Sequence, residues 1–290
     1  MSGPEGISPG LLARLAKHAT QHKYDHGHAL VVAGGPGRGG AARLAARAAL
    51  RVGAGLVTVG CPAEALTENA AQLTAIMLRA LKGSAGLEEV LEDARINALC
   101  LGPGLGQGTE TRNMVRVALA TRRAIVLDAD ALTSFADTPR ALFSLLHGQA
   151  VLTPHAGEFA RLFPEDGRAL TQAPAEKALE MRRNAVLGAA ARSGAVVLLK
   201  GEVTLIADPS GHMAEHHMTG QAAAPWLATA GSGDVLAGIV TGLLARGFSP
   251  LQAADLATWL HAAAARNVGP GLIAEDLPDA LPAVFAQASL

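Results

Sequence analysis

The segment Thr229–Asp234 places a glycine-rich turn directly before an apolar stretch and puts a carboxylate in the first turn of the expected helix. Glycine lets the backbone turn with its amides exposed, and a helix start carries partial positive charge. Gly231, Ser232 and Gly233 are therefore predicted to form an anion hole for a transferring phosphate. Asp234 is predicted to be the catalytic base that removes a proton from the group accepting the phosphate. The alternative is that Asp234 only complements the helix dipole, worth roughly 0.5–2 kcal/mol.

Three other segments carry polar side chains where predicted strands end, which is where ligands bind in open α/β sheets. His155 and Glu158 follow one strand, although Glu158 could simply decorate a helix start. Lys200 ends another strand, where it either neutralises a nucleotide phosphate or lies solvated at the surface. Asp128 and Asp130 could hold a metal, but no other ligand shares their spacing. We predict a hydrogen-bonding role for Asp128 and no metal site made by protein side chains alone.

A formal G-x-G-x-x-G occurs at Gly35–Gly40, after a predicted strand and before a predicted helix, as a dinucleotide-binding fingerprint requires. The fingerprint also needs an acidic residue about 20 positions later, at the end of the second strand. That strand ends at Cys61, and no carboxylate occurs before Glu64. A hydride-transferring dehydrogenase is therefore disfavoured. The loop remains either a phosphate or substrate contact through its amides, or a structural turn.

Short apolar runs alternate with helix-like stretches along most of the chain. Strands are predicted at 29–33, 56–61, 98–101, 124–127, 151–153 and 195–199, with a hairpin at 203–207 and 213–217. Helices are predicted at 10–19, 40–52, 109–121, 174–192, 234–246 and 250–267. Continuous apolar strands favour burial on both faces, so we predict an α/β fold with a mainly parallel sheet. Residues 1–8 are predicted to be flexible and 9–290 to form a single domain.

The composition of the chain argues against proteins that bind nucleic acid or membranes. Half of the 290 residues are apolar, and the formal net charge is -1. That balance gives no electrostatic footprint for nucleic acid or an anionic membrane, so neither is expected as a partner. Cys61 and Cys100 are predicted to be buried free thiols. The N-terminus lacks the pattern of a signal peptide and no run is long enough to span a membrane, so we expect a cytoplasmic protein.

Taken together, the strand ends resemble those of the ADP-dependent NAD(P)H-hydrate dehydratases, which have a ribokinase-like fold. The resemblance runs from His22 to Leu281. Its segments are His22-Lys23, Gly34–Ala41, Gly102–Gly106, Asp128–Leu132, Leu152–Glu158, Lys200–Thr204, Gly231–Gly238, His261 and Ala274–Leu277. The Gly-Ser-Gly-Asp turn marks ribokinase-like enzymes in general. The Thr-Pro-His-x-Gly-Glu and Gly-Pro-Gly-Leu-Gly segments point to the dehydratases.

The resemblance implies a three-layer α/β/α fold without a separate lid domain, and a hydro-lyase that repairs nicotinamide cofactors. The S epimer of 6-hydroxylated, hydrated NADH or NADPH would be phosphorylated by ADP and would then lose phosphate, with AMP as the other product. Mg²⁺ would accompany ADP, bound mostly by phosphates and water. By position, Ala41, Gly104, Gly106, His155 and Asp234 would line the hydrate site, whereas Lys200, Gly201, Glu202, Val203, Thr204 and Gly233 would bind the adenine nucleotide.

The sequence departs from the family pattern in two places. Pro36–Arg38 stands where the first glycine loop usually has a serine, and the segment 220–227 is longer than the common turn. The family also occurs fused to an epimerase domain, which does not fit before Pro9, so we expect cooperation with a separate epimerase. A homotetramer would suit the family. Two alternatives stay open: a small-molecule kinase with the same anion hole, and a nucleotide-binding module without turnover.

Overall fold

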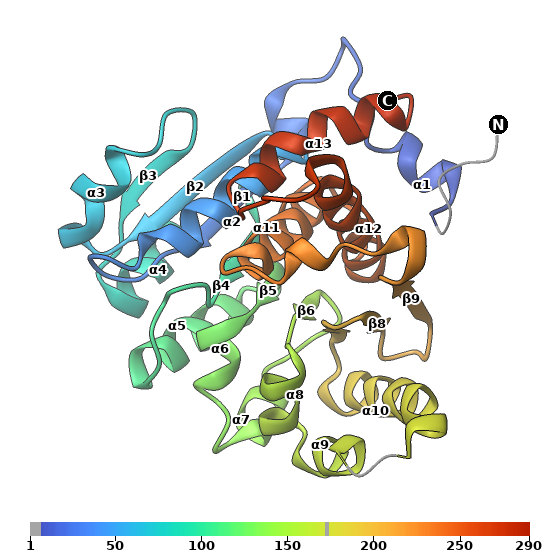
Figure 1. Ribbon diagram of the computed structural model, residues 1–290. Helices are drawn as coiled ribbons and strands as arrows, with labels where there is room; N and C mark the ends of the chain where they lie inside the picture. The colour runs from blue at the N-terminus through green and yellow to red at the C-terminus, as the bar shows by residue number, and fades with distance from the viewer. Residues whose placement is uncertain (1–6, 172–173) are drawn as a thin grey trace.

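The computed structural model describes residues 7–171 and 174–290, and its strands form one nine-stranded sheet (Figure 1). The order across the sheet is β3-β2-β1-β4-β5-β6-β7-β8-β9. The strands are β1 (His28–Val32), β2 (Leu56–Cys61), β3 (Met77–Ala80), β4 (Ile96–Leu101), β5 (Ala124–Leu127), β6 (Ala150–Leu152), β7 (Val196–Leu199), β8 (Val203–Ala207) and β9 (Met213–His217). Strands β1 to β7 are parallel, and β8 is antiparallel to both neighbours. The predicted parallel sheet with a terminal hairpin is confirmed.

Most helices connect successive strands, and the last three helices come after the final strand of the sheet. They are α1 (Pro9–Ala13), α2 (Gly39–Arg51), α3 (Leu66–Ala70), α4 (Gly83–Val90), α5 (Thr109–Ala120), α6 (Ala129–Thr133), α7 (Pro139–Phe143), α8 (Ala156–Leu162), α9 (Pro164–Thr171), α10 (Ala178–Ser193), α11 (Ser232–Ala245), α12 (Pro250–Val268) and α13 (Asp276–Gln287). Short 3₁₀ turns are η1 (Lys23–His26), η2 (Ala63–Ala65), η3 (Ala175–Lys177), η4 (Gly220–Ala222) and η5 (Pro225–Leu227).

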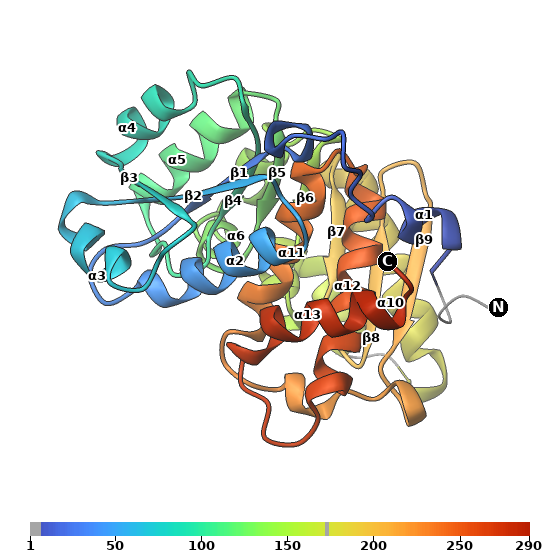
Figure 2. The ribbon, with the colours of Figure 1, turned by 90° about the horizontal axis from the view of Figure 1, so that it is seen from above.

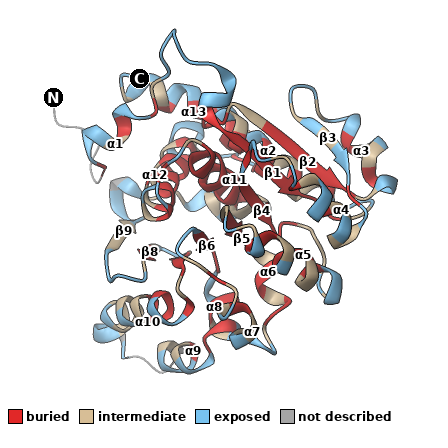
Figure 3. Cartoon of the chain, turned by 180° about the vertical axis from the view of Figure 1, so that it is seen from behind, coloured by how far each residue is buried: buried red, intermediate tan, exposed pale blue. Residues whose placement is uncertain are grey.

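Two hydrophobic cores lie on opposite faces of the sheet. Alternate residues of β1 point to opposite faces, so Ala29 and Val31 join one core while Leu30 and Val32 join the other. The first core packs under α2, α11, α12 and α13, and the second under α4, α5, α8 and α10. Figure 2 shows α4 and α5 across the sheet from α2, and Figure 3 shows buried residues running through the central strands. The predicted three-layer α/β/α arrangement is confirmed.

Helix α11 approaches α2 so closely that only glycine fits at two contact positions. A Cβ on Gly238 would lie 2.1 Å from the carbonyl oxygen of Ala45, and one on Gly242 would lie 2.6 Å from that of Ala49. These neighbours are backbone atoms of a buried helix, so they cannot move aside without shifting α2. This packing fixes the start of α11 relative to the loop before α2.

We expect Gly238→Ala to lower the free energy of unfolding by about 1–3 kcal/mol, because the added methyl overpacks a buried helix contact. Gly188→Ala is the matched control, since its Cβ would meet only the mobile end of the Arg192 side chain in α10. That control should be neutral or stabilising by up to about 1 kcal/mol, as alanine favours helix over glycine. Urea unfolding of both variants measures the difference, and equal stabilities would contradict this packing account.

Several predicted elements differ from those observed. The helix predicted at 10–19 ends at Ala13, because the following residues 16–20 are largely exposed and have no core to pack against. The helix predicted at 174–192 is divided into η3 and α10. Strand β3 was missed because it is a half-exposed edge strand that contains Arg79. The predicted flexible segment 1–8 falls mostly outside the described residues, and the single domain over 9–290 stays a prediction.

Candidate active site

The carboxyl ends of the parallel strands meet at one edge of the sheet, and the predicted site residues follow those ends. Ala41 and the loop before it follow β1, whereas Gly104 and Gly106 follow β4. His155 follows β6 and Lys200 follows β7. Helix α11, which carries Asp234, packs against β1, β4 and β5 beneath this edge. Segments far apart in the sequence are thereby brought to one place.

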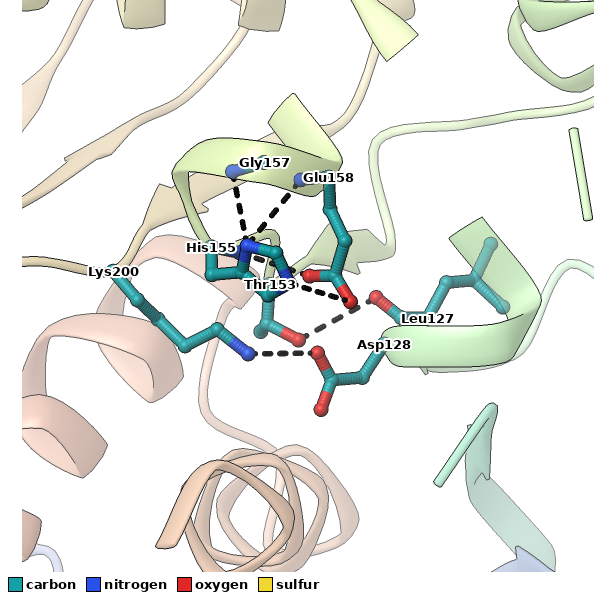
Figure 4. Close-up of polar contacts among 7 residues, drawn as sticks. All are labelled: Leu127, Asp128, Thr153, His155, Gly157, Glu158 and Lys200. Carbon is teal, nitrogen blue, oxygen red and sulfur yellow. Dashed lines mark hydrogen bonds and ion pairs between the residues drawn. The ribbon is translucent and has the colours of Figure 1, made fainter. Parts of the chain in front are cut away.

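Lys200 and Asp128 form an ion pair at this edge, with 2.9 Å between Nζ and Oδ1 (Figure 4). The Asp128 side chain is 2% exposed and that of Lys200 is 22% exposed. Burial opposes the charge of the lysine, but the charge of Asp128, the hydrogen bond to it, and the charges of Glu158 and Asp234 together raise the pKa of Lys200. The hydrogen-bonding role predicted for Asp128 is confirmed. Lys200 is not a solvated surface lysine, so the surface alternative is wrong.

The ammonium group of Lys200 also lies against the predicted anion hole. Its Nζ is 3.4 Å from the position that a Cβ would take on Gly233. Gly231 is the N-cap of α11, has φ 87°, and makes no side-chain hydrogen bond to the helix start. The first amides of a helix have no acceptor within the helix. A cation and a helix N-terminus therefore converge on the same small region, and both favour an anion there.

The glycine at 231 is required by packing as well as by its left-handed conformation. A Cβ there would lie 2.7 Å from Cδ1 of Leu44 and 2.9 Å from Cβ of Ala274. The Ser232 hydroxyl donates to the carbonyl oxygen of Leu227 at 2.7 Å. Through that bond the 220–227 segment, the one that departs from the family pattern, helps to hold the turn in place.

Asp234 lies in the first turn of α11 but does not cap it. Burial raises the pKa of Asp234 to about 6, the negative charge of Asp128 adds to the effect, and the positive charge of Lys200 opposes it. Asp130 and Glu158 contribute smaller repulsions. A carboxylate whose pKa is raised toward neutral pH, beside a predicted anion hole, is suited to accept a proton from a hydroxyl group.

His155 and Glu158 form a reciprocal cap at the start of α8. Nδ1 of His155 accepts from the amides of Gly157 at 2.9 Å and Glu158 at 3.4 Å, while Oε2 of Glu158 accepts from the His155 amide at 2.9 Å. Because Nδ1 is an acceptor, the ring proton of neutral His155 belongs on Nε2. The side chain of His155 is 55% exposed and that of Glu158 only 8%. Glu158 thus has a structural role, and His155 stays a predicted substrate contact.

The two glycine loops touch each other. Gly104 packs against the loop before α2, where its Cβ would lie 3.5 Å from that of Ala41 and 2.6 Å from the carbonyl oxygen of Arg38. The amide of Gly106 donates to Asp130 at 2.8 Å. The two loops therefore place Ala41 next to Gly104, with Gly106 close by. Asp130, which accepts from the Gly106 amide, also raises the pKa of Asp234 slightly through its negative charge.

The formal dinucleotide fingerprint does not present free amides along its whole length. The amide of Gly37 donates to Oε2 of Glu68 at 2.8 Å. A dinucleotide pyrophosphate needs amides at such a turn, and a carboxylate beside them repels it. This geometry is a further argument against a hydride-transferring dehydrogenase.

The segment from Gly201 to Thr204 is held by contacts away from Asp234. Thr204 is buried and its hydroxyl donates to the carbonyl oxygen of Gly201 at 3.2 Å. The carbonyl oxygen of Val203 accepts from Arg182 at 3.1 Å, and that of Glu202 from the Met218 amide at 2.8 Å. The nucleotide contacts assigned to these residues stay predictions.

Two charged or polar residues near the site lie in segments that carry or depart from the family resemblance, but sequence reasoning gave neither a role. Arg38 reaches toward Gly106, with Nη1 2.9 Å from the position of an added Cβ. His261 of α12 is buried, and burial lowers its pKa to about 4, although the nearby backbone of Ser232 acts in the opposite direction. Its Nε2 is buried without a hydrogen-bond partner among the described residues. A single histidine in an alanine-rich apolar helix was the available signal.

The described residues contain no group of three or more His, Cys, Asp or Glu side chains arranged to bind a metal ion. Both cysteines are buried and free, as predicted. Over the same described ranges, every helix is too short or too polar to cross a bilayer.

Comparison with known proteins identifies the family. A family model described as NAD(P)H-hydrate dehydratase matches residues 29–281. A bifunctional NAD(P)H-hydrate repair enzyme from Salinibacter ruber is 39% identical over 287 residues, covering 94% of this chain and 50% of that protein. An ADP-dependent (S)-NAD(P)H-hydrate dehydratase from Xanthomonas campestris is 33% identical and covers 91% of this chain and 89% of that protein. The chain spans about half the length of the bifunctional relatives.

Solved structures agree with the sequence relatives. An ADP/ATP-dependent NAD(P)H-hydrate dehydratase from Bacillus subtilis, co-crystallised with ATP and Mg²⁺, superposes with a TM-score of 0.76 at 28% identity over 99% of both chains. A ribokinase-like superfamily protein from Enterococcus faecalis has a TM-score of 0.78 at 23% identity, covering 97% of this chain and 95% of that one, which shows the same fold. The predicted ribokinase-like fold and the resemblance are confirmed. The chain belongs to the NAD(P)H-hydrate dehydratase family.

Proposed function

We propose that this protein uses ADP to dehydrate the S epimer of hydrated NADH or NADPH, releasing AMP and phosphate. The observation that carries the proposal is the convergence of Lys200, the Gly231–Gly233 turn and the largely buried Asp234 carboxylate at the carboxyl ends of the parallel strands. The family membership and the ADP-dependent relative in Xanthomonas support the substrate and the phosphate donor.

The chemistry divides into two steps. The hydroxyl oxygen on ring carbon 6 attacks the terminal phosphorus of ADP, its proton passes to Asp234, and the bond between the two ADP phosphates breaks to give AMP. The amides of the Gly231–Gly233 turn and the Lys200 ammonium stabilise negative charge on the moving phosphoryl group. The ring nitrogen then expels phosphate from carbon 6, and loss of a proton from carbon 5 restores the double bond.

Mg²⁺ is proposed to accompany the nucleotide. Such an ion would be held mainly by phosphate and water oxygens. When bound, Mg²⁺ neutralises charge on the ADP phosphates.

The direct test is to incubate the protein with hydrated NADH, ADP and Mg²⁺ and to follow the reduced-nicotinamide absorbance band. We expect the band to return in proportion to the S epimer, with equal amounts of AMP and phosphate. Recovery should then stop until a separate epimerase is added, because this reaction consumes one epimer only. A kinase would release a phosphorylated product without restoring the band, and a binding module would do neither.

We expect kcat/KM to fall about tenfold for each pH unit below about 6, because the base must be ionised to accept the hydroxyl proton. The sign follows from the pKa of Asp234, which burial raises to about 6, so the active form is lost at a higher pH than for an exposed aspartate. Rates between pH 5 and 8, corrected for acid loss of the substrate, measure this limb. A profile flat down to pH 4.5 would contradict the assignment.

A further inference from the structure

A cavity lies beside α2, between that helix and the 72–76 loop before β3. Its volume is about 760 Å³, which lies in the range of small-molecule sites. Arg43, Arg47 and Arg51 line it. They are spaced four residues apart, so they occupy one face of the helix. None of these arginines is used by the chemistry described above.

This cavity adjoins the candidate active site. Gly40, which lines it, directly precedes Ala41 of the predicted hydrate site. Leu44 also lines it, and the same Leu44 side chain lies 2.7 Å from the position of a Cβ on Gly231. The two spaces therefore share a wall at the start of α11.

The charge of the cavity favours an anion. Among the described residues that line it, Glu275 is the one carboxylate against three arginines. Arg47 and Arg51 share the carboxylate of Asp279 in α13, at 2.5 and 2.9 Å. Arg43 instead donates to the neutral side-chain oxygen of Asn69 at 3.1 Å. Arg43 is thus the one of the three arginines whose hydrogen-bond partner is neutral, and the carboxylate of Glu68 lies near it, beside Gly39.

We propose that this cavity binds the phosphate-bearing adenosine half of the hydrated dinucleotide, with Arg43 against a phosphate. The nicotinamide half then lies at Ala41, Gly104 and Asp234. The inference rests on the proposed function, which supplies a long, anionic substrate for two adjoining spaces. A guanidinium group is suited to the task, because its planar fork binds phosphate oxygens in pairs.

The test compares two substrates that share the reacting ring. One is hydrated NADPH, and the other is the hydrated reduced nicotinamide mononucleotide, which lacks the adenosine half. We expect Arg43→Ala to lower kcat/KM for the dinucleotide about tenfold or more, because a charged hydrogen bond is lost. The mononucleotide value should stay within about twofold, because that substrate does not reach the cavity. Arg116→Ala is the matched control, since Arg116 also lies on a helix and donates to an asparagine oxygen, that of Asn113.

The outcomes separate this inference from the proposed function. Equal loss on both substrates, or no loss on either, overturns the role of the cavity while leaving the dehydratase activity standing. If the unaltered protein turns over neither substrate, the proposed function fails, and calorimetry with adenosine 2′,5′-bisphosphate then decides the inference alone. The dissociation constant of Arg43→Ala for this ligand must be about tenfold higher than that of Arg116→Ala. Equal dissociation constants for the two variants overturn the inference.

Discussion

Replacing Asp234 with asparagine is expected to lower turnover by about 100-fold or more while nucleotide binding is retained. Asparagine has nearly the same shape but cannot accept the hydroxyl proton at neutral pH. The proposed anion hole consists of backbone amides with Lys200 as its cation, so neither would depend on the Asp234 carboxylate. Single-turnover rates with hydrated NADH, together with the dissociation constant for ADP, measure the two effects separately. Unchanged turnover would remove the base assignment.

The same substitution also distinguishes a base from a helix cap by its effect on stability. A pKa raised to about 6 means that the ionised form is disfavoured in the folded state. That penalty is absent below the unfolded pKa of about 3.9 and is complete above about pH 6. At pH 7.5 Asp234→Asn should therefore raise the free energy of unfolding by roughly 1–3 kcal/mol. If Asp234 stabilised the helix dipole, the same change would lower it.

Glu110, in the first turn of α5, is a matched control for that measurement. It accepts a hydrogen bond from the Ser84 amide, which lowers its pKa. Neutralising it in Glu110→Gln should therefore reduce stability at pH 7.5 and leave turnover unchanged. Opposite signs for the two variants at one pH would show that the effect depends on the local environment of each carboxylate.

Much of the site could be predicted because its parts are local in sequence. The Gly231–Asp234 turn, the strand ends at His155 and Lys200, and the apolar strands each carry their signal within a few residues. Parallel strands then force those ends to one edge of the sheet, so their convergence follows from the fold. The same logic allowed a mainly parallel, helix-covered sheet to be predicted from the alternating apolar runs, whereas the three-layer fold was implied by the family resemblance.

The missing parts depend on contacts between distant segments. Lys200 is separated by 72 positions from Asp128, and nothing near either residue indicates that they pair. The role of Glu158 was ambiguous because a cap and a catalytic acid use the same residue type at the same place. Strand β3 was missed because an edge strand needs no continuous apolar run, and its pattern of exposure is set by the neighbouring β2.

The Lys200–Asp128 pair gives the second large expected effect. Replacing Lys200 with methionine should lower the free energy of unfolding by about 2–4 kcal/mol, because Asp128 is left as a buried, unpaired charge. Turnover should fall about 100-fold or more, since a cation beside the anion hole is lost. The pKa of Asp234 should also rise, because Lys200 is the group that lowers it. The acid limb of the rate profile is therefore expected to move to higher pH.

A double variant separates the structural part of this effect from the catalytic part. Asp128→Asn combined with Lys200→Met removes both charges, so most of the lost stability should return, whereas turnover should stay low. Lys200→Arg keeps the charge and should retain more activity than methionine. If the double variant recovered activity along with stability, Lys200 would serve only to neutralise Asp128, and the phosphate would have to be stabilised by the α11 amides without it.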